Sequence, residues 1–354
     1  MKFLLLTTGG TIASVASKQG FVPALSGEKL LEACPLLMGF EHDLEIVDVF
    51  SKDSSNMHPQ DWLTLEETIR RAGDCDAVVV LHGTDTLAWT SAALSYLLQD
   101  VAAPVVLTGS MLPPGEPDSD APENIYAAFQ FALQLALYKR RGVAVAFADT
   151  LFHGPRVTKL DSRRKKAFAS VDYPLLGEMK DKGGHKVAWL TPHSPNFSGR
   201  RLWDTPRFET DIALVPIFPG MKPSRLEAVL ASGPKAVVLE AYGLGGVPYM
   251  HESFLEPIAR GITSGVPIVL RTQSAFGGTD LSVYEVGTKV LDLGALSAGD
   301  MTREALMVKL MLLLPRLQEK KSETDLGKEL ATGLSANLCD DITDTVNAGV
   351  QGRW

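Results

Sequence analysis

The chain has 354 residues, of which 45% are hydrophobic and 21% are charged, and its formal net charge is -8 at pH 7. This length is typical of about two domains, and the composition is that of a globular protein, which excludes wholesale disorder, a collagen-like repeat and a bundle of membrane helices. The acidic balance argues against a nucleic-acid surface, because phosphate binding needs clustered Lys and Arg, and the short basic run 163–166 is typical of a solvated face.

The cysteines and histidines indicate neither a disulfide framework nor a metal site. Cys34, Cys75 and Cys339 are widely spaced without a CxxC pair, and the seven histidines do not form a pattern such as HExxH. The N-terminal MKFLLLTTGG resembles a signal peptide over about four apolar residues, whereas such a peptide needs roughly 7–15. We therefore expect a cytoplasmic protein that binds no metal and does not associate with a membrane.

The N-terminal half alternates between apolar runs of strand length and segments with helical spacing. The runs are continuous, as strands buried on both faces require. A helix is predicted from Pro59, where Trp62, Leu65 and Ile69 share one face, and a second over Asn124–Tyr138. Such alternation predicts a parallel sheet with helices on both sides. The predicted strands are Phe3–Leu6, the more mixed Leu44–Phe50, Ala77–Leu81, Pro104–Leu107 and Val143–Ala148.

Proline and glycine accumulate between Ala169 and Thr210, which indicates a domain junction. The α/β rhythm then resumes, and Thr302 is a suitable N-cap for the last predicted helix. Strands are predicted at Ile212–Phe218, Ala236–Leu239 and Ile268–Leu270, and helices at Phe254–Ile262 and Thr302–Leu314.

The predicted fold class is α/β with two domains. We expect a larger N-terminal catalytic domain over residues 1–190, with a mostly parallel sheet flanked by helices, and a linker over 191–211. A smaller parallel-sheet domain is expected over 212–317. The extension 318–354 has weak apolar periodicity and many charges, and is predicted to be a tail or a peripheral helix.

Hydroxyls, glycines and aspartates follow four successive predicted strands. In open parallel sheets, ligands bind beyond the carboxyl ends of the strands, so these segments are the candidate site. Their composition suits hydroxyl-based nucleophilic chemistry on a small polar substrate. The segments are TTGGTIAS at 7–14, SKDSSNM at 51–57, HGTDT at 82–86 and TGSMLPPGEPDSDAPEN at 108–124.

Each of these motifs has more than one interpretation when taken alone. TTGGTIAS lacks the third glycine of a dinucleotide fingerprint, so it is either a tight turn or a frame that brings backbone close to a substrate and places the Thr11 hydroxyl. Thr84 could be a turn residue, Asp85 a helix cap and Lys159 a solvated lysine. Their joint placement at strand ends favours a nucleophile that is activated by a neighbouring base.

Taken as a set, the motifs TTGGTIAS, DSSNM, HGTDT, TGSMLP with SDAPEN, VTK, FAS, YGLGG and AGDMT resemble the bacterial-type L-asparaginase family, and within it the cytoplasmic, type I-like branch. They occur in family order from residue 4 to about residue 315. The resemblance implies an amidohydrolase that converts L-asparagine to L-aspartate and ammonia through a threonine nucleophile, without a cofactor or a metal.

The resemblance also implies the roles of individual residues. Thr11 corresponds to the threonine that attacks the side-chain amide carbon, Thr84 and Lys159 activate the nucleophile or a water, and Asp85 binds the substrate's amino group. Ser54 and Ser55 correspond to the pair that helps to hold the α-carboxylate. The remaining residues that we assign to substrate binding are Gly10, Gly83 and Ser110.

Three positions depart from the family pattern. Phe21 stands in the loop where members often carry a tyrosine close to the nucleophile, Gly246 ends YGLGG where YGxGN is common, and Leu112 replaces a frequent arginine. Without the loop tyrosine, either Lys159 and Thr84 activate the nucleophile alone, or Ser14 or Ser17 substitutes, or turnover is slow.

Two other functions stay open beside the amidohydrolase. One is the amidase subunit of a tRNA-dependent amidotransferase, a family that usually carries an additional N-terminal domain, whereas the first motif here begins at residue 4. The other is an amino-acid-binding or sensing homologue with weak turnover, which Phe21 and Gly246 motivate. The family likeness further implies a homodimer or a homotetramer, and two-fold assemblies are the most common kind.

Overall fold

The chain folds into two compact units. The computed structural model describes residues 1–17, 20–23, 25–37, 40–180, 187–191, 198–319 and 326–343, and it describes the side chains of these residues except those of 16, 17, 20–23 and 319. One unit comprises Met1–Asp204 together with Leu338–Asp340, and the other comprises Thr205–Asn337 and Asp341–Trp354. The predicted linker over 191–211 includes the point where the chain leaves the N-terminal unit.

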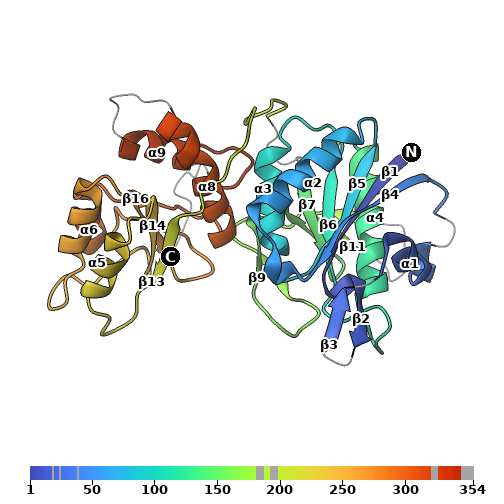
Figure 1. Cartoon of the computed structure of the whole chain (residues 1–354), viewed down its shortest axis with the longest axis horizontal. Coiled ribbons are helices and arrows are strands. Elements are labelled where there is room, and N and C mark those ends of the chain that lie inside the picture. The colour runs from blue at the N-terminus through green and yellow to red at the C-terminus, as the bar shows by residue number, and fades with distance from the viewer. Residues whose placement is uncertain are drawn as a thin grey trace. The chain divides into compact units, whose positions relative to one another are not determined.

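An eight-stranded sheet forms the centre of the N-terminal unit, in the order β12-β11-β8-β7-β6-β5-β1-β4 (Figure 1). The strands from β4 to β7 in this order are parallel, and β8, β11 and β12 are added antiparallel. The prediction of a mostly parallel sheet is therefore confirmed. The strands are β1 (Lys2–Gly9), β4 (Asp43–Lys52), β5 (Ala77–Leu81), β6 (Val105–Thr108), β7 (Val143–Phe147), β8 (Thr150–His153), β11 (Gly177–Met179) and β12 (Val187–Trp189).

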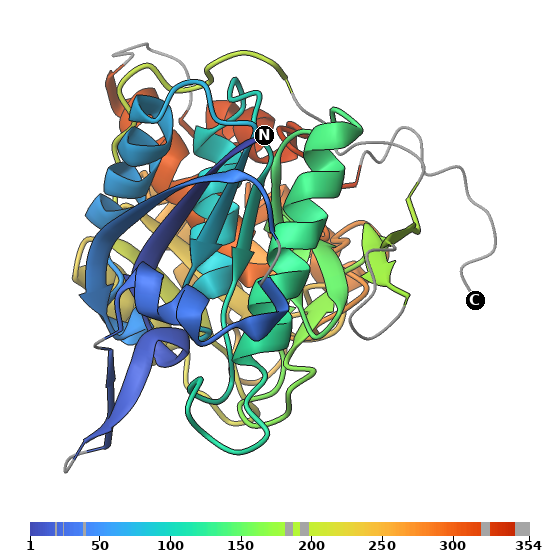
Figure 2. The same cartoon turned by 90° about the vertical axis from the view of Figure 1, so that its right-hand side faces the viewer.

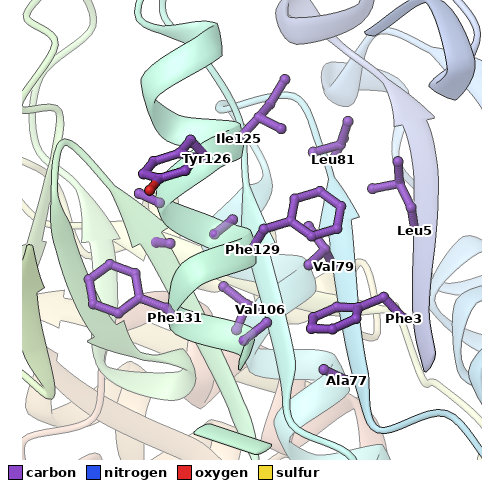
Figure 3. Close-up of a cluster of buried hydrophobic side chains, with 14 of the residues drawn as sticks. Phe3, Leu5, Ala77, Val79, Leu81, Val106, Ile125, Tyr126, Phe129 and Phe131 are labelled. Carbon is purple, nitrogen blue, oxygen red and sulfur yellow. The ribbon is translucent and has the colours of Figure 1, made fainter. Parts of the chain in front are cut away.

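Helices cover both faces of this sheet, and Figure 2 shows α4 on one side of it and α2 on the other. Successive side chains of a strand point to opposite faces, so a run such as Phe3–Leu6 must be covered twice. Phe3 belongs to the cluster beneath α4, where its ring centroid lies 5.9 Å from that of Phe129 (Figure 3), and Leu4 on the opposite face is also fully buried. The main helices are α2 (Pro59–Arg71), α3 (Leu87–Leu97) and α4 (Ala121–Leu137).

Smaller elements complete the N-terminal unit. The hairpin of β2 and β3 projects away from the sheet (Figure 2). The pair of β9 and β10 is a separate two-stranded sheet. These elements are β2 (Ser14–Ser17), β3 (Gly20–Pro23), β9 (Val157–Lys159), β10 (Phe168–Ser170), helix α1 (Gly27–Glu32) and the short 3-10 helices η1 (Thr11–Ala13), η2 (Pro35–Leu37), η3 (Ser54–Asn56) and η4 (Gly154–Arg156).

The predicted strands and the helix from Pro59 are confirmed within a few residues. The helix predicted from Asn124 begins three residues earlier, at Ala121. Helix α3 was not predicted, and its burial explains why, since ten of its eleven residues are buried. A helix covered all round shows no apolar stripe against a polar face, so its sequence lacks the helical period.

The C-terminal unit contains a four-stranded parallel sheet in the order β13-β14-β15-β16, which confirms the predicted second α/β domain. Thr302 caps helix α8 as predicted, because its hydroxyl accepts a hydrogen bond from the Ala305 amide at 3.0 Å. The elements of the C-terminal unit are β13 (Ile212–Pro216), β14 (Ala236–Ala241), β15 (Ile268–Thr272), β16 (Leu296–Ser297), α5 (Ser224–Ala231), α6 (Leu255–Thr263), α7 (Glu285–Asp292), α8 (Arg303–Glu319) and α9 (Leu326–Ser335).

Candidate active site

The double glycine at the end of β1 lets two loops pack backbone against backbone. Gly10 has a φ of 77°, and a Cβ on it would stand 2.2 Å from the Gly83 Cα in the loop after β5. The Gly10 carbonyl accepts hydrogen bonds from the Ala13 amide at 3.0 Å and from the Ser14 hydroxyl at 2.8 Å. The turn therefore holds Thr11, which is half-buried, at the start of η1 beside the HGTDT loop.

This packing predicts a large effect of Gly10→Ala. The substitution adds the strain of a positive φ, roughly 1–2 kcal/mol, and a methyl group for which no space exists, so we expect a loss of about 4 kcal/mol or more in the free energy of unfolding. Gly142→Ala is the matched control, because Gly142 also has a positive φ, 97°, but nothing lies within 4 Å of its Cβ position. Denaturant unfolding of both variants measures the difference. Equal losses would mean that the contact between the two loops is not what Gly10 provides.

Three residues of the predicted catalytic set meet through their side chains. Lys159 Nζ lies 2.8 Å from Thr84 Oγ1 and 2.7 Å from Asp85 Oδ1. The Lys159 side chain is only 17% exposed, whereas the Asp85 carboxylate is 64% exposed. Lys159 is thus a half-buried amine in contact with a hydroxyl and with a largely exposed carboxylate.

Ser54 and Ser55 lie at the end of β4, but they face different partners. Ser54 is buried, and a Cβ on Gly83 would stand 2.6 Å from its Oγ, so it adjoins the same loop contact. Ser55 is exposed and donates its hydroxyl to Asp53 Oδ1 at 2.6 Å. This hydroxyl and the Ser55 amide lower the pKa of the Asp53 carboxyl.

Ser110 lies in a loop that two side chains of α4 hold in place. The Asp120 carboxylate, at the N-terminus of the helix, accepts hydrogen bonds from the Met111 and Leu112 amides at 3.0 Å. Asn124 donates to the Gly109 carbonyl at 2.9 Å and accepts from the Ala148 amide at 3.0 Å. Leu112, at the position of a frequent family arginine, thus helps to fix this loop through its backbone amide.

The SDAPEN motif therefore has a structural role that sequence reasoning did not assign. Ser110 itself is fully buried, and its hydroxyl has no hydrogen-bond partner among the described residues. Asp120 and Asn124 fix the backbone on either side of Ser110, at Met111 and at Gly109. The sequence signal for Asp120 and Asn124 was that each is a polar residue at the start of an otherwise apolar helix.

His82 fixes the loop that carries Thr84, and its role was also missed. Its Nδ1 lies 2.7 Å from the Gly83 carbonyl, which can only accept, so Nδ1 carries the proton. Nε2 then accepts from the Thr90 hydroxyl at 2.9 Å, and Thr90 Oγ1 in turn accepts from Trp62 Nε1 at 3.1 Å. Complete burial lowers the pKa of His82 from 6.5 to about 4, so the ring is neutral.

This shift predicts a pH dependence of stability. Because the folded pKa of His82 is depressed, the unfolded chain binds more protons between pH 6.5 and about 4. The contribution of the neutral ring is present above pH 6.5 and is lost as the pH falls through this window, by about 3 kcal/mol in total. Denaturant unfolding at several pH values should show a weaker dependence in His82→Gln. An identical pH dependence in the two proteins would show that His82 is not the responsible group.

Several predictions concern residues that the structure describes in part. The side chains of Phe21 and Ser17 lie outside the described residues. The Ser14 hydroxyl is buried and donates to the Gly10 carbonyl, so in this structure it supports the turn. Gly246 lies in the C-terminal unit, where its amide donates to the Tyr242 carbonyl at 2.7 Å.

The described side chains contain no group of three or more His, Cys, Asp or Glu that could hold a metal ion. Among the described parts of the chain, none of the helices combines the length and the apolar character needed to span a bilayer.

Comparisons with known proteins match both units of the chain. Residues 2–192 match the family model "Asparaginase, N-terminal", and residues 211–325 match "Glutaminase/Asparaginase C-terminal domain". The chain is 38% identical to an L-asparaginase of Thermococcus kodakarensis over 345 residues, which cover 97% of this chain and 99% of that one.

Two further comparisons extend this picture. The solved structure of the thermostable L-asparaginase from Thermococcus kodakarensis superposes with a TM-score of 0.83 at 36% identity, over 97% of this chain and 99% of that one. The chain is also 32% identical to a glutamyl-tRNA(Gln) amidotransferase component of Methanopyrus kandleri, over 96% of this chain and 74% of that protein. These similarities therefore cover both units.

Proposed function

The chain belongs to the asparaginase family, and on this premise we propose that it hydrolyses L-asparagine to L-aspartate and ammonia with Thr11 as the nucleophile. The observation that carries this proposal is the contact of Lys159 Nζ with Thr84 Oγ1 at 2.8 Å, in a loop packed through Gly83 against the Gly10 turn. The proposed nucleophile Thr11 lies on the turn after β1, and the adjoining loop after β5 carries Thr84, which the candidate base Lys159 contacts from the end of β9. This is the arrangement that a hydroxyl nucleophile needs.

The reaction follows from this arrangement. The Thr11 hydroxyl adds to the side-chain amide carbon of asparagine, while its proton passes towards Thr84 and Lys159. The same pair returns a proton to the amide nitrogen, which leaves as ammonia, and an ester with Thr11 remains. Water then adds to the ester carbon and releases aspartate with the Thr11 hydroxyl restored.

The charges at the site match a zwitterionic amino acid. The exposed Asp85 carboxylate supplies an anionic contact for the α-ammonium group, and Ser54 supplies a hydrogen-bond donor for the α-carboxylate. Ser55 can do so only if its hydroxyl leaves Asp53. Gly10, Gly83 and Ser110 complete the proposed set of substrate-binding residues.

A cytoplasmic location and a two-fold assembly are part of the proposal. None of the three cysteines, all of which lie in the described ranges, is in a disulfide, and Cys34 and Cys75 are thiols, as expected in a reducing compartment. The assembly is a homodimer or a homotetramer, which light scattering distinguishes. A monomer at all concentrations would contradict it.

Ammonia release from L-asparagine by the pure full-length chain tests the activity. The proposal predicts catalytic turnover, and L-glutamine in the same assay measures specificity, because one methylene is worth only about 1–3 kcal/mol in a pocket. Binding of asparagine in calorimetry without ammonia release would favour a sensor. Ammonia release that required a partner protein and tRNA would favour an amidotransferase component.

A further inference from the structure

A three-residue C-terminal strap, Leu338–Asp340, belongs to the N-terminal unit although more than 130 residues separate it from Asp204 in the sequence. It contacts the segment that runs from β8 through η4 to β9, at whose end Lys159 lies. His153 Nε2 is 2.6 Å from the Cys339 carbonyl, and the Arg156 guanidinium donates through Nε to the Asp340 carbonyl. The strap therefore contacts two buried side chains within six residues of Lys159.

Arg156 makes this contact a strong constraint. It is 1% exposed, and its guanidinium lies 5.4 Å from the centre of the Tyr173 ring, whose hydroxyl donates to the Asp340 carboxylate at 2.9 Å. Removing a buried cation from its partners costs several kcal/mol, so this part of the chain cannot shift while the strap stays in place. Arg156 is three residues before Lys159, a reach of at most about 11 Å.

The strap itself is held in a specific conformation. Asp340 has a φ of 54°, a left-handed conformation that non-glycine residues adopt uncommonly and keep only where surrounding contacts enforce it. The next residue, Asp341, is fully buried in the C-terminal unit. There its carboxylate accepts from Lys309 Nζ at 2.7 Å, and Lys309 is also fully buried.

The β8–β9 segment is fixed on α3 as well. The Gly154 carbonyl accepts from the Ser91 hydroxyl at 2.8 Å, and a Cβ on Gly154 would stand 2.6 Å from Ser95 Oγ. At the end of η4, the Arg156 carbonyl accepts from the Val171 amide at 2.8 Å, which joins this segment to the end of β10. Contacts with α3, β10 and the strap thus determine the path of the backbone to Lys159.

We propose that the strap is a positioning element for the reaction: by holding His153 and Arg156 through Cys339 and Asp340, it fixes the start of β9 and so the place of Lys159 Nζ against Thr84. This inference rests on the proposed function. It gives a role to the end of the chain, whose sequence alone indicates only a tail or a peripheral helix.

A double-mutant cycle between the strap contacts and Lys159 tests this inference. Arg156→Lys keeps the charge but loses the Nε donor, and Tyr173→Phe removes one hydroxyl. Because a misplacement of about 1 Å can lower a rate by up to about 10²-fold, we expect Arg156→Lys to lower kcat for asparagine about 10- to 100-fold, with KM within about threefold. Tyr173→Phe should lower kcat less, about 3- to 10-fold. In a Lys159→Ala background neither change should lower kcat further.

Arg70→Lys is the matched control in both backgrounds. Arg70 also lies in the N-terminal unit and donates to a carbonyl, that of Leu97, and to a carboxylate, that of Asp100, but it does not contact the segment that leads to Lys159. It should lower the unfolding temperature and leave kcat unchanged. This control shows whether a general loss of stability is enough to lower kcat in the way that we expect of Arg156→Lys.

Equal losses of kcat from Arg156→Lys with and without Lys159 would overturn the inference, because the strap would then act on the whole unit. If Lys159→Ala has no measurable rate, the crystal structure of Arg156→Lys decides between a displaced Lys159 and one still 2.8 Å from Thr84. The ammonia assay and this crystal structure together separate the two proposals. An unmodified chain that releases no ammonia contradicts the proposed activity, whereas an undisplaced Lys159 contradicts only the proposed role of the strap.

Discussion

Replacing Thr11 with alanine is expected to lower kcat for asparagine hydrolysis by about 10⁴-fold or more, because removal of the proposed covalent nucleophile leaves only binding and backbone contacts to accelerate the reaction. Thr11 contributes little to the core, since it is half-buried at the start of η1. The free energy of unfolding should therefore change by less than about 1 kcal/mol. Steady-state ammonia release and denaturant unfolding measure the two quantities.

Thr8→Val is the matched control for this variant. Thr8 precedes the same double glycine and is buried, with its hydroxyl donating to the Leu81 carbonyl at 3.0 Å. Loss of that hydrogen bond should reduce stability by roughly 1 kcal/mol while kcat stays near that of the unmodified chain. Substantial activity in Thr11→Ala would mean that another hydroxyl is the nucleophile, and Thr84 would be the next residue to test.

Replacing Lys159 with methionine should lower kcat about 10²- to 10⁴-fold, the usual contribution of a positioned acid or base. Methionine keeps much of the length and apolar contact of the lysine side chain but removes the amine that lies against Thr84 and Asp85. Loss of the ion pair with the largely exposed Asp85 should affect stability little. Pre-steady-state release of ammonia measures the effect on the first chemical step.

Lys165→Met controls for the loss of a positive charge near the same segment. Lys165 is exposed, lies six residues beyond Lys159 and belongs to the basic run 163–166. It should leave kcat unchanged at moderate ionic strength, where exposed charges are screened. A similar loss of kcat in the two lysine variants would point to a general charge effect and would remove Lys159 from the proposed pair.

Much of the fold could be predicted from the sequence because the apolar runs are continuous. Buried parallel strands need such runs, and the carboxyl ends of β4, β1, β5 and β6 are neighbours in the sheet, as expected for segments that share a site. Helix α3 and the antiparallel strands β8, β11 and β12 were not predicted. The helix is buried nearly all round, and β11 and β12, of three residues each, are too short to carry a pattern of their own.

The candidate site could be predicted as a set of loops, but its internal contacts could not. No local pattern pairs Lys159 with Thr84, since 75 residues separate them and the contact depends on where β9 lies. The same holds for the strap, whose partners are distant in sequence. The partners of His82 are close in sequence, but its role depends on its complete burial. The resemblance to the asparaginases supplied residue assignments that spacing alone left open.

A crystal structure of the full-length chain with L-aspartate bound tests the central claim most directly. The proposed mechanism predicts one ligand on which three residues converge: the Thr11 hydroxyl at the side-chain carboxylate, the Asp85 carboxylate at the α-ammonium group, and Ser54 at the α-carboxylate. Lys159 should still contact Thr84. An ordered Thr11 whose hydroxyl points into the core, away from the bound ligand, would contradict the assignment of the nucleophile and with it the proposed mechanism.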